Sequence, residues 1–214
     1  NEVIKRAYIY KKFNDKDILN KLIKNNIKID YLEKYELDKI ESGNHQGIIL
    51  EVNDYDYASI DEIMDDKVVV MLDHLEDPHN LGAIIRTCEA AGVKSIVIPK
   101  DRAVKVNSTV IKVSVGAIKN VRIVMVNNLV NTLKELKDNG FWVIGTDMQG
   151  EDYRTLDYSG KVVLVIGNEG KGLSRLTREN CDFMARIPMR GEVNSLNASV
   201  AAALVIYEAV KDEL

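Results

Sequence analysis

Short, almost wholly apolar segments recur along residues 67–189, and segments with helical spacing separate them. The apolar segments are VVVML (68–72), SIVI (95–98), VRIVMV (121–126), FWVIGT (141–146) and KVVLVIG (161–167), with a last one near FMARIPM (183–189). Strands that are apolar on both sides must be covered on both faces, which is typical of a parallel sheet between helices. We therefore expect an α/β fold whose ligands bind at the carboxyl ends of the strands.

The helical segments between these strands are NLGAIIRTCEAAG (80–92), NSTVIKVSVGAIKN (107–120), NNLVNTLKELKDNG (127–140) and LSRLTRENC (173–181). Residues 1–53 instead alternate shorter elements, with a helix after Asp15 as its cap, and predict a small separate α/β unit. Residues 54–66 are acidic and lack a long apolar run, so we interpret them as a linker that ends in a short helix. The predicted domains are residues 1–53 and 67–214.

The charge of the chain is unevenly distributed. The net charge is −4, but residues 1–28 hold eight Lys and Arg against three Asp and Glu. Residues 29–66 hold two against twelve, and residues 67–214 are almost neutral. A lysine-rich helix face in solvent is the simpler explanation of the basic segment, and a contact with a phosphate backbone is the other.

Several classes of protein are excluded or disfavoured. The apolar runs are shorter than the roughly 20 residues of a membrane span, and the first residues lack the apolar core of a signal peptide. Cys88 and Cys181 are isolated within patterned segments and predict buried thiols of a reducing compartment, the cytoplasm. The three histidines have no partner at ligand spacing, so no metal site is expected.

Three polar loops follow predicted strands and carry the candidate site. In the first, Asp77-Pro78 marks a turn, Asn80 is expected to cap the next helix, and Arg86 falls opposite the apolar stripe of that helix. The second loop, IGNEGKGLSRL (166–176), is rich in glycine but matches no phosphate-loop spacing. Glu169 within it would repel a phosphate, which favours a less anionic ligand.

The third loop precedes the apolar segment ASVAAALVIYEAV (198–210). Asn194, Ser195 and Asn197 crowd the start of that predicted helix, although one cap is enough. The surplus of polar groups suggests a second role besides capping. From the residues alone the chain is an α/β enzyme with a cofactor pocket formed by three loops.

The three loops together resemble those of the SPOUT class of knotted RNA methyltransferases, within it the TrmH-like 2′-O-ribose methyltransferases. The resemblance lies in DPHNLGAIIRTCEAAG (77–92), IGNEGKGLSRLTRENCD (166–182) and IPMRGEVNSLNASVAAA (187–203). DRAVKVNSTVIKVSVGA (101–117) and HQGII (45–49) are similar to the bacterial 23S rRNA guanosine 2′-O-methyltransferase branch. The likeness is strong over residues 67–214 and weaker over residues 1–53.

The resemblance implies a C-terminal trefoil knot that holds S-adenosylmethionine and a first domain like a small ribosomal protein that binds RNA. It assigns the cofactor to positions near Gly145, Thr146, Gly167, Ile187, Met189 and Leu196. The polar site residues that it implies are Asn80, Arg86, Glu169, Ser195 and Asn197. One departure is that the family has a longer first helix and more residues before the first strand than are present here.

A methyl transfer to a ribose hydroxyl needs alignment of oxygen, methyl and sulfur, and help for a poor nucleophile. Arg86 would lie beside that hydroxyl, with Asn80 and Glu169 holding Arg86 or the ribose. The apolar final helix and the resemblance both suggest a homodimer. The resemblance implies a guanosine of 23S rRNA as the substrate, and a tRNA is the alternative within the family. The alternative from another class is a ribosome-associated RNA-binding protein without catalysis.

Overall fold

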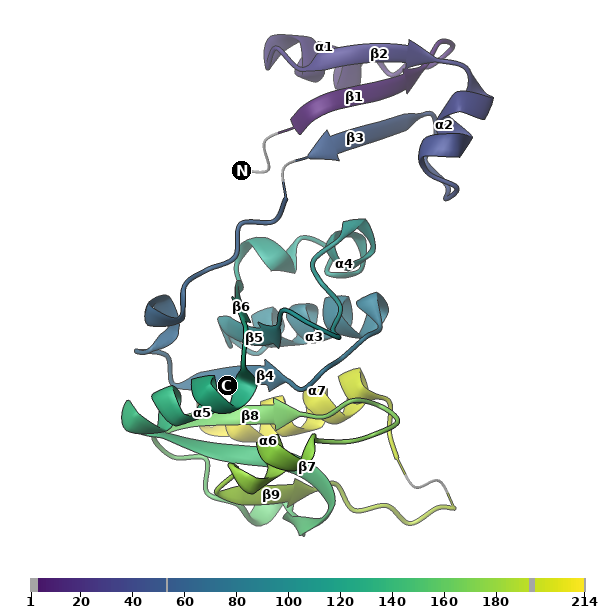
Figure 1. The fold of residues 1–214 in the computed structure, drawn as a ribbon. Coiled ribbons are helices and arrows are strands. Elements are labelled where there is room, and N and C mark those ends of the chain that lie inside the picture. The colour runs from purple at the N-terminus through teal and green to yellow at the C-terminus, as the bar shows by residue number, and fades with distance from the viewer. Residues whose placement is uncertain (1–3, 53, 193–194, 214) are drawn as a thin grey trace. The chain divides into compact units, whose positions relative to one another are not determined.

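The computed structural model describes residues 4–52, 54–192 and 195–213. The chain forms two compact units, residues 1–56 and residues 57–214, and each has its own sheet (Figure 1). The elements of the first unit are β1 (Ile4–Tyr10), α1 (Lys16–Lys24), β2 (Lys28–Leu32), α2 (Lys34–Ile40) and β3 (Ile48–Val52).

The first unit is a three-stranded sheet with a small core. Its strand order is β2-β1-β3, with β1 parallel to β2 and antiparallel to β3. Ala7 and Ile9 of β1 are fully buried and form the core with Leu22 of α1. Asp15 caps α1, as predicted, because its carboxylate accepts the amide hydrogens of Asp17 and Ile18 at 3.1 Å.

The second unit alternates strands and helices along the chain. Its strands are β4 (Val68–Leu72), β5 (Ser95–Pro99), β6 (Arg122–Val126), β7 (Phe141–Asp152), β8 (Lys161–Ile166) and β9 (Phe183–Arg186). Its α-helices are α3 (Pro78–Ala90), α4 (Ser108–Val113), α5 (Leu129–Asp138), α6 (Arg175–Glu179) and α7 (Ala198–Ala209). Short 3₁₀ turns are η1 (Ile60–Ile63), η2 (Ala117–Lys119), η3 (Tyr153–Thr155) and η4 (Lys211–Glu213).

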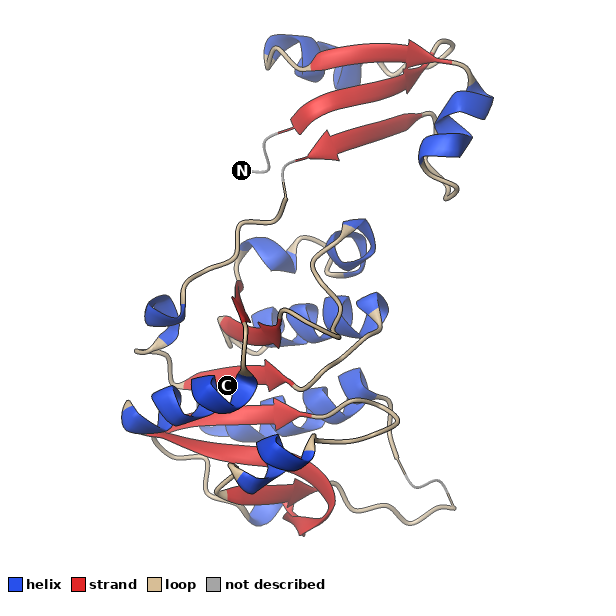
Figure 2. Ribbon diagram, viewed as in Figure 1, coloured by secondary structure: helices blue, strands red, loops and turns tan. Residues whose placement is uncertain are grey.

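The six strands form one parallel sheet in the order β6-β5-β4-β8-β7-β9. Every residue of β4 and of β5 is buried, because helices cover both faces of the sheet (Figure 2). This confirms the parallel α/β sheet predicted from the apolar runs. The order reverses between β4 and β8, since the chain first adds β5 and β6 on one side of β4 and then places β7, β8 and β9 on the other side, with β8 next to β4.

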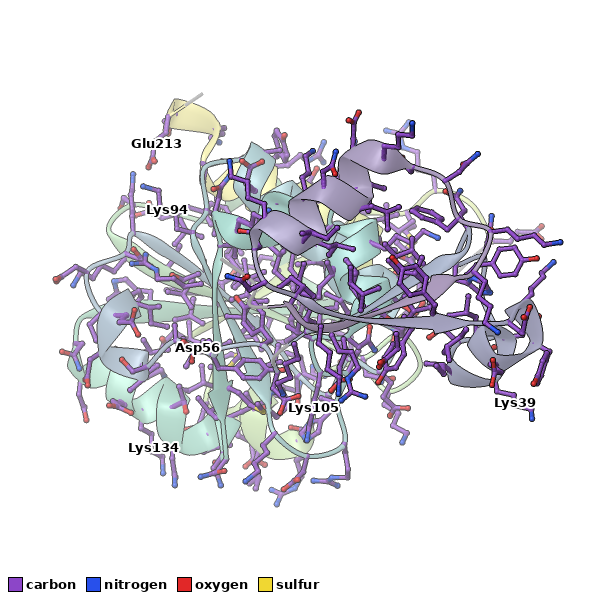
Figure 3. The ribbon with its side chains drawn as sticks, turned by 90° about the horizontal axis from the view of Figure 1, so that it is seen from above. Lys39, Asp56, Lys94, Lys105, Lys134 and Glu213 are labelled. Atoms are coloured by element: carbon purple, nitrogen blue, oxygen red, sulfur yellow. The ribbon has the colours of Figure 1, made fainter. Side chains whose placement is uncertain are left out.

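The two faces of the sheet carry different helices. On one face, alternate residues such as Val69, Met71 and Val163 pack with Leu133 and Leu136 of α5. Lys134 of the same helix points outward (Figure 3). On the other face α3 packs against α7, and α7 also contacts β8. Within the range 54–66, Ala58 pairs with Val124 and Ile63 is fully buried in this core.

Strand β7 is longer than the pattern predicted, since it continues past Thr146 to Asp152. Its pairing with β9 breaks between Thr146 and Glu151, and both of these residues lie opposite Ala185. At Gly150 an added Cβ would come within 2.2 Å of the Met184 carbonyl oxygen. The strand therefore bulges and folds closely over its neighbour, which requires glycine at this position.

Candidate functional site

The three polar loops all lie at the carboxyl edge of the six-stranded sheet. The first follows β4, the second follows β8, and the third follows β9. Strands β4 and β8 are direct neighbours, and β7 lies between β8 and β9. Because all six strands are parallel, their carboxyl ends meet at one edge, where such sheets bind ligands.

The first loop ends in the cap of α3, and the cap is Asp77. Its carboxylate accepts the amide hydrogen of His79 at 2.8 Å, and Pro78 occupies the first helical position. The prediction that Asn80 caps this helix was wrong. Pro fits the first turn because it lacks an amide hydrogen, so the helix begins two residues before Asn80 and places that side chain inside it.

Asn80 is buried, and its amide nitrogen donates a hydrogen bond to the Glu169 carboxylate. The turn that carries Glu169 is tightly closed, since Asn168 and Gly172 exchange two backbone hydrogen bonds of 2.9 and 3.1 Å. The Asn168 side chain accepts the amide hydrogen of Gly170 at 3.0 Å and donates to the His74 carbonyl at 2.9 Å. The second loop is thus fixed to the first, and the structure brings Asn80 and Glu169 together.

Arg86 lies six residues after Asn80 on α3, about 9 Å further along the helix axis. Its side chain is exposed and forms no hydrogen bond or ion pair with the described residues. Glu169 was predicted to hold either Arg86 or the ribose; the structure shows no pair between Glu169 and Arg86, and the Glu169 carboxylate accepts a hydrogen bond from Asn80. The Arg86 guanidinium keeps all its donors for a ligand, such as a hydroxyl or a phosphate oxygen.

At the start of α7, capping is done by one residue. The Asn197 side chain accepts the amide hydrogen of Ser199 at 2.9 Å and the Ser199 hydroxyl hydrogen at 2.6 Å. Ser195 is exposed and forms no hydrogen bond with the described residues, while Asn194 lies outside them. The surplus of polar groups noted in the sequence is therefore real at Ser195, whose hydroxyl is free for a ligand.

The positions implied for the cofactor follow three neighbouring strands. Gly145 and Thr146 belong to β7, Gly167 follows β8, and Ile187 and Met189 follow β9. Leu196 directly precedes the capping residue of α7. The sheet order therefore places the first five positions along one stretch of the carboxyl edge.

Two glycines in this stretch are required by close packing. A Cβ at Gly167 would lie 2.5 Å from the carbonyl carbon of Gly172, and one at Gly145 would lie 2.7 Å from Cys181 Sγ. The Thr146 hydroxyl donates to the Val165 carbonyl at 3.2 Å and accepts the Gly167 amide hydrogen only at 3.4 Å. The backbone is thus held in a narrow turn whose amide is weakly engaged, as a ligand-binding backbone requires.

Three of the implied positions carry partly buried apolar side chains. They are Ile187 and Met189, which follow β9, and Leu196, which precedes α7. Apolar side chains with a few backbone polar groups are the usual surroundings of an adenine ring. These apolar side chains and the weakly engaged amide of Gly167 fit the adenosyl group of S-adenosylmethionine.

Sequence reasoning missed two polar residues directly after β4. Asp73 is buried, and one carboxylate oxygen accepts the Ser174 amide hydrogen at 2.6 Å while the other lies 2.5 Å from His74 Nδ1. His74 has a positive φ of 58°, which is uncommon for a residue other than glycine. The sequence feature that could have indicated Asp73 and His74 is their position directly after the wholly apolar strand VVVML.

Cys88 is buried and Cys181 is partly buried, and both are free. No group of three or more His, Cys, Asp and Glu in residues 4–52, 54–192 and 195–213 could hold a metal ion. Across the same ranges, none of the helices has the length and apolar character to cross a membrane.

Comparisons with known proteins agree with this geometry. The SpoU rRNA methylase family matches residues 67–207, and the family described as RNA 2′-O ribose methyltransferase substrate binding matches residues 1–58. The class is therefore an α/β RNA methyltransferase with a separate substrate-binding unit. The chain belongs to the SpoU/TrmH family of RNA methyltransferases.

Relatives of known sequence and structure cover most of the chain. YacO of Bacillus subtilis, which is named as a TrmH family tRNA/rRNA methyltransferase, is 47% identical over 86% of this chain and 78% of its own. The AdoMet-bound rRNA methyltransferase of Sinorhizobium meliloti is 26% identical with a TM-score of 0.83, covering 100% of this chain and 82% of its own. The TrmH/SpoU tRNA modifying enzyme of A. aeolicus is 34% identical with a TM-score of 0.64, covering 72% and 80%.

Proposed function

We propose that the protein transfers a methyl group from S-adenosylmethionine to a ribose 2′-hydroxyl of RNA. The observation that carries this proposal is the unpaired, exposed guanidinium of Arg86, on the helix whose first turn holds Asn80 against Glu169. The match of residues 1–58 to a 2′-O ribose methyltransferase substrate-binding family supports ribose rather than base as the target.

S-adenosylmethionine would supply an electrophilic methyl group on a sulfonium. The chain must then position the hydroxyl and stabilise negative charge while the hydroxyl proton passes to solvent water. Arginine stays protonated in proteins, so Arg86 stabilises the developing alkoxide and an adjacent phosphate rather than accepting the proton. Glu169 fixes Asn80, and Ser195 adds a free hydroxyl from the third loop.

The same proposal places the cofactor at Gly145, Thr146, Gly167, Ile187, Met189 and Leu196. It includes the trefoil knot, because the chain leaves β9 at one edge of the sheet and returns to α7, which packs on α3 and β8. The segment between β9 and α7 crosses from the edge strand toward the central strands, near the Gly167 turn after β8. In this proposal it encloses the adenosyl group on several sides.

For the substrate we propose a guanosine of 23S rRNA, methylated in the cytoplasm. The S. meliloti rRNA methyltransferase aligns with all of this chain, including the first unit. The second candidate is a tRNA, because the A. aeolicus tRNA modifying enzyme is more identical in sequence although it aligns with only 72% of the chain.

We also propose that the enzyme acts as a homodimer through α7. Val200, Leu204 and Tyr207 are 49%, 37% and 42% exposed on the side of α7 away from its core face, and they line a hollow with Tyr153. An apolar patch of this kind on a helix indicates a protein interface. Light scattering at micromolar concentration should give a dimer for the wild type and a monomer for Leu204→Glu.

The function is tested with purified protein, radiolabelled S-adenosylmethionine and total rRNA or tRNA from a strain that lacks the gene. We expect label in 23S rRNA, at a nucleotide that resists alkaline hydrolysis because its 2′-oxygen is methylated. Label in tRNA alone would favour the second candidate. Binding of RNA without binding of S-adenosylmethionine would overturn the proposal in favour of a non-catalytic RNA-binding protein.

A further inference from the structure

A cavity of about 450 Å³ lies on the α5 side of the carboxyl edge in the second unit. We call it the α5 cavity; it is bounded by the segments that follow β4, β5, β6 and β8, which include Asp73, Pro99, Asn127 and Asn168. None of the five polar site residues named above lines it. Its volume is in the usual range of small-ligand pockets.

The position of the α5 cavity in the sheet is one where ligands are expected. Asp73 directly follows β4 and Asn168 follows β8, and β4 and β8 are the neighbours between which the strand order reverses. In open parallel sheets the crevice outside the carboxyl ends at this reversal is the general ligand-binding position. The first and second polar loops line the α5 cavity with residues from 73–76 and 168–176, whereas their site residues Asn80 and Glu169 do not line it.

Two residues at the cavity have strained backbones. His74 and Arg102 have φ values of 58° and 53°, and only three other residues besides glycine have a positive φ in the described part of the chain. Such conformations cost free energy and concentrate at functional sites. His74 is also fixed through Nδ1 by the buried carboxylate of Asp73 at 2.5 Å, which leaves Nε2 as its available polar edge.

The lining combines apolar surfaces with unengaged polar side chains. Pro99 and Leu129 are buried apolar residues. The side chains of Asn127, Arg102 and Lys171 form no hydrogen bond or ion pair with the described residues. Two carboxylates, Glu76 and Asp101, also line the cavity and offset the charge of Arg102 and Lys171. Apolar surface with amide and ring groups suits a nucleobase, and the two cations are the groups that could contact its phosphate.

The turn that carries Glu169 separates the α5 cavity from the candidate active site. Asn168 lines the cavity, while the next residue, Glu169, accepts the hydrogen bond from Asn80 on the other side. Adjacent residues of one turn, Asn168 and Glu169, therefore belong to the α5 cavity and to the candidate active site.

We propose that the α5 cavity is a second nucleotide subsite, which takes an unpaired nucleobase next to the nucleotide that is methylated. Arg102 and Lys171 contact its phosphate, and His74 and Asn127 contact the base. The inference rests on the proposed function for the identity of the ligand as part of an RNA substrate. It adds that substrate choice depends on a neighbouring base, read on the far side of the Glu169 turn.

The test follows backbone amide signals of the full-length, isotope-labelled chain by NMR. Each of the four nucleoside 5′-monophosphates is added separately, and inorganic phosphate is added in a parallel titration. We expect at least one nucleotide to shift the signals of residues 127–130 and 172–174, and phosphate alone to leave Leu129 and Leu173 unshifted. Equal shifts with phosphate, or nucleotide shifts confined to residues 80–86 and 195–197, would overturn the subsite.

Variants separate binding from folding. Arg102→Gly removes the cation but suits the left-handed backbone, and it should weaken nucleotide binding roughly fivefold. Lys94→Ala removes the same charge at the amino end of β5, where Lys94 is labelled in Figure 3, and should leave binding unchanged. Equal losses in the two variants would mean that only net charge matters, and the subsite would be rejected.

A kinetic readout completes the test. His74→Asn tolerates the same backbone and keeps a donor for Asp73, so it should raise KM for RNA with little change in kcat. Binding of S-adenosylmethionine is measured separately in each variant. Failure of the wild type to bind S-adenosylmethionine would sink the proposed function, whereas nucleotide shifts at residues 127–130 would still support the cavity as a nucleotide site.

Discussion

The side-chain amide of Asn80 donates a hydrogen bond to the carboxylate of Glu169, although the two residues are 89 positions apart in the chain. This bond joins the first turn of α3 to the glycine-rich turn after β8. Since Asn80 is buried, the bond also satisfies a polar group that would otherwise be costly to bury.

The first prediction concerns this bond. Asn80→Asp would place a second carboxylate against Glu169, and we expect the free energy of unfolding to fall by about 2 kcal/mol because like charges repel in a partly buried site. Adding Glu169→Gln should restore most of the loss, since the amide can then donate to the new carboxylate. Denaturant unfolding of both variants checks this, and a double variant no more stable than Asn80→Asp would contradict it.

The second prediction concerns Arg86. Arg86→Lys keeps the charge but loses the planar fork of donors, so methyl transfer should fall by about two orders of magnitude. The free energy of unfolding should stay within about 0.5 kcal/mol, because the side chain is exposed and unpaired. Arg154→Lys, at an exposed arginine outside the three loops that pairs with Asp152, is the control and should keep wild-type turnover. Normal turnover in Arg86→Lys with intact cofactor affinity would argue against a specific role.

The third prediction separates Ser195 from Asn197. Asn197→Ala removes the cap of α7 and should lower the free energy of unfolding by about 1 kcal/mol. Ser195→Ala removes a hydroxyl that forms no hydrogen bond with the described residues, so it should lower kcat with little effect on the melting temperature. Calorimetry and single-turnover rates measure the two effects. If Ser195→Ala loses only stability, its role is structural.

The fourth prediction concerns the narrow turn after β8. Gly167→Ala would force a Cβ against the backbone of Gly172, so the turn must open and affinity for S-adenosylmethionine should fall at least tenfold. Gly191→Ala is the control, because an added Cβ there meets no atom within 4 Å. Calorimetric titration of both variants is the measurement. Equal affinities in the two would show that the Gly167 turn does not shape the cofactor site.

The fifth prediction uses the pH dependence of stability. Burial raises the pKa of the Cys181 thiol to about 12. In the unfolded chain this thiol ionises near pH 9, so above that pH the unfolded state gains stability that the folded state does not. The stability is fully present below pH 9 and is lost as the pH rises toward 12.

Cys181→Ala should therefore remove roughly 1 kcal/mol of the fall in unfolding free energy between pH 8 and pH 10. Urea unfolding of wild type and variant at the two pH values gives the difference, and other titrating groups cancel in it. The same slope in both proteins would mean that the thiol is not protected in the folded state.

Much of the fold was readable from the chain. The apolar runs at residues 68–72, 95–98 and 161–167 predicted β4, β5 and β8, because a strand buried on both faces has no polar positions. The capping role of Asn197 was also among the predicted possibilities. The start of α3 was predicted wrongly, because two residues of capping type, Asp77 and Asn80, stand three positions apart. The structure shows that the helix begins at Pro78, which makes Asp77 the cap.

The sequence by itself determined the local elements, the parallel class of sheet and the loops that carry chemistry, because periodicity and turn residues act over a few neighbouring positions. Only the tertiary structure decided which polar groups meet. It joined Asn80 to Glu169, left Arg86 and Ser195 free, and placed His74 at a cavity with Arg102. Such pairings depend on the order of strands in the sheet, which brings distant segments together and which no local pattern encodes.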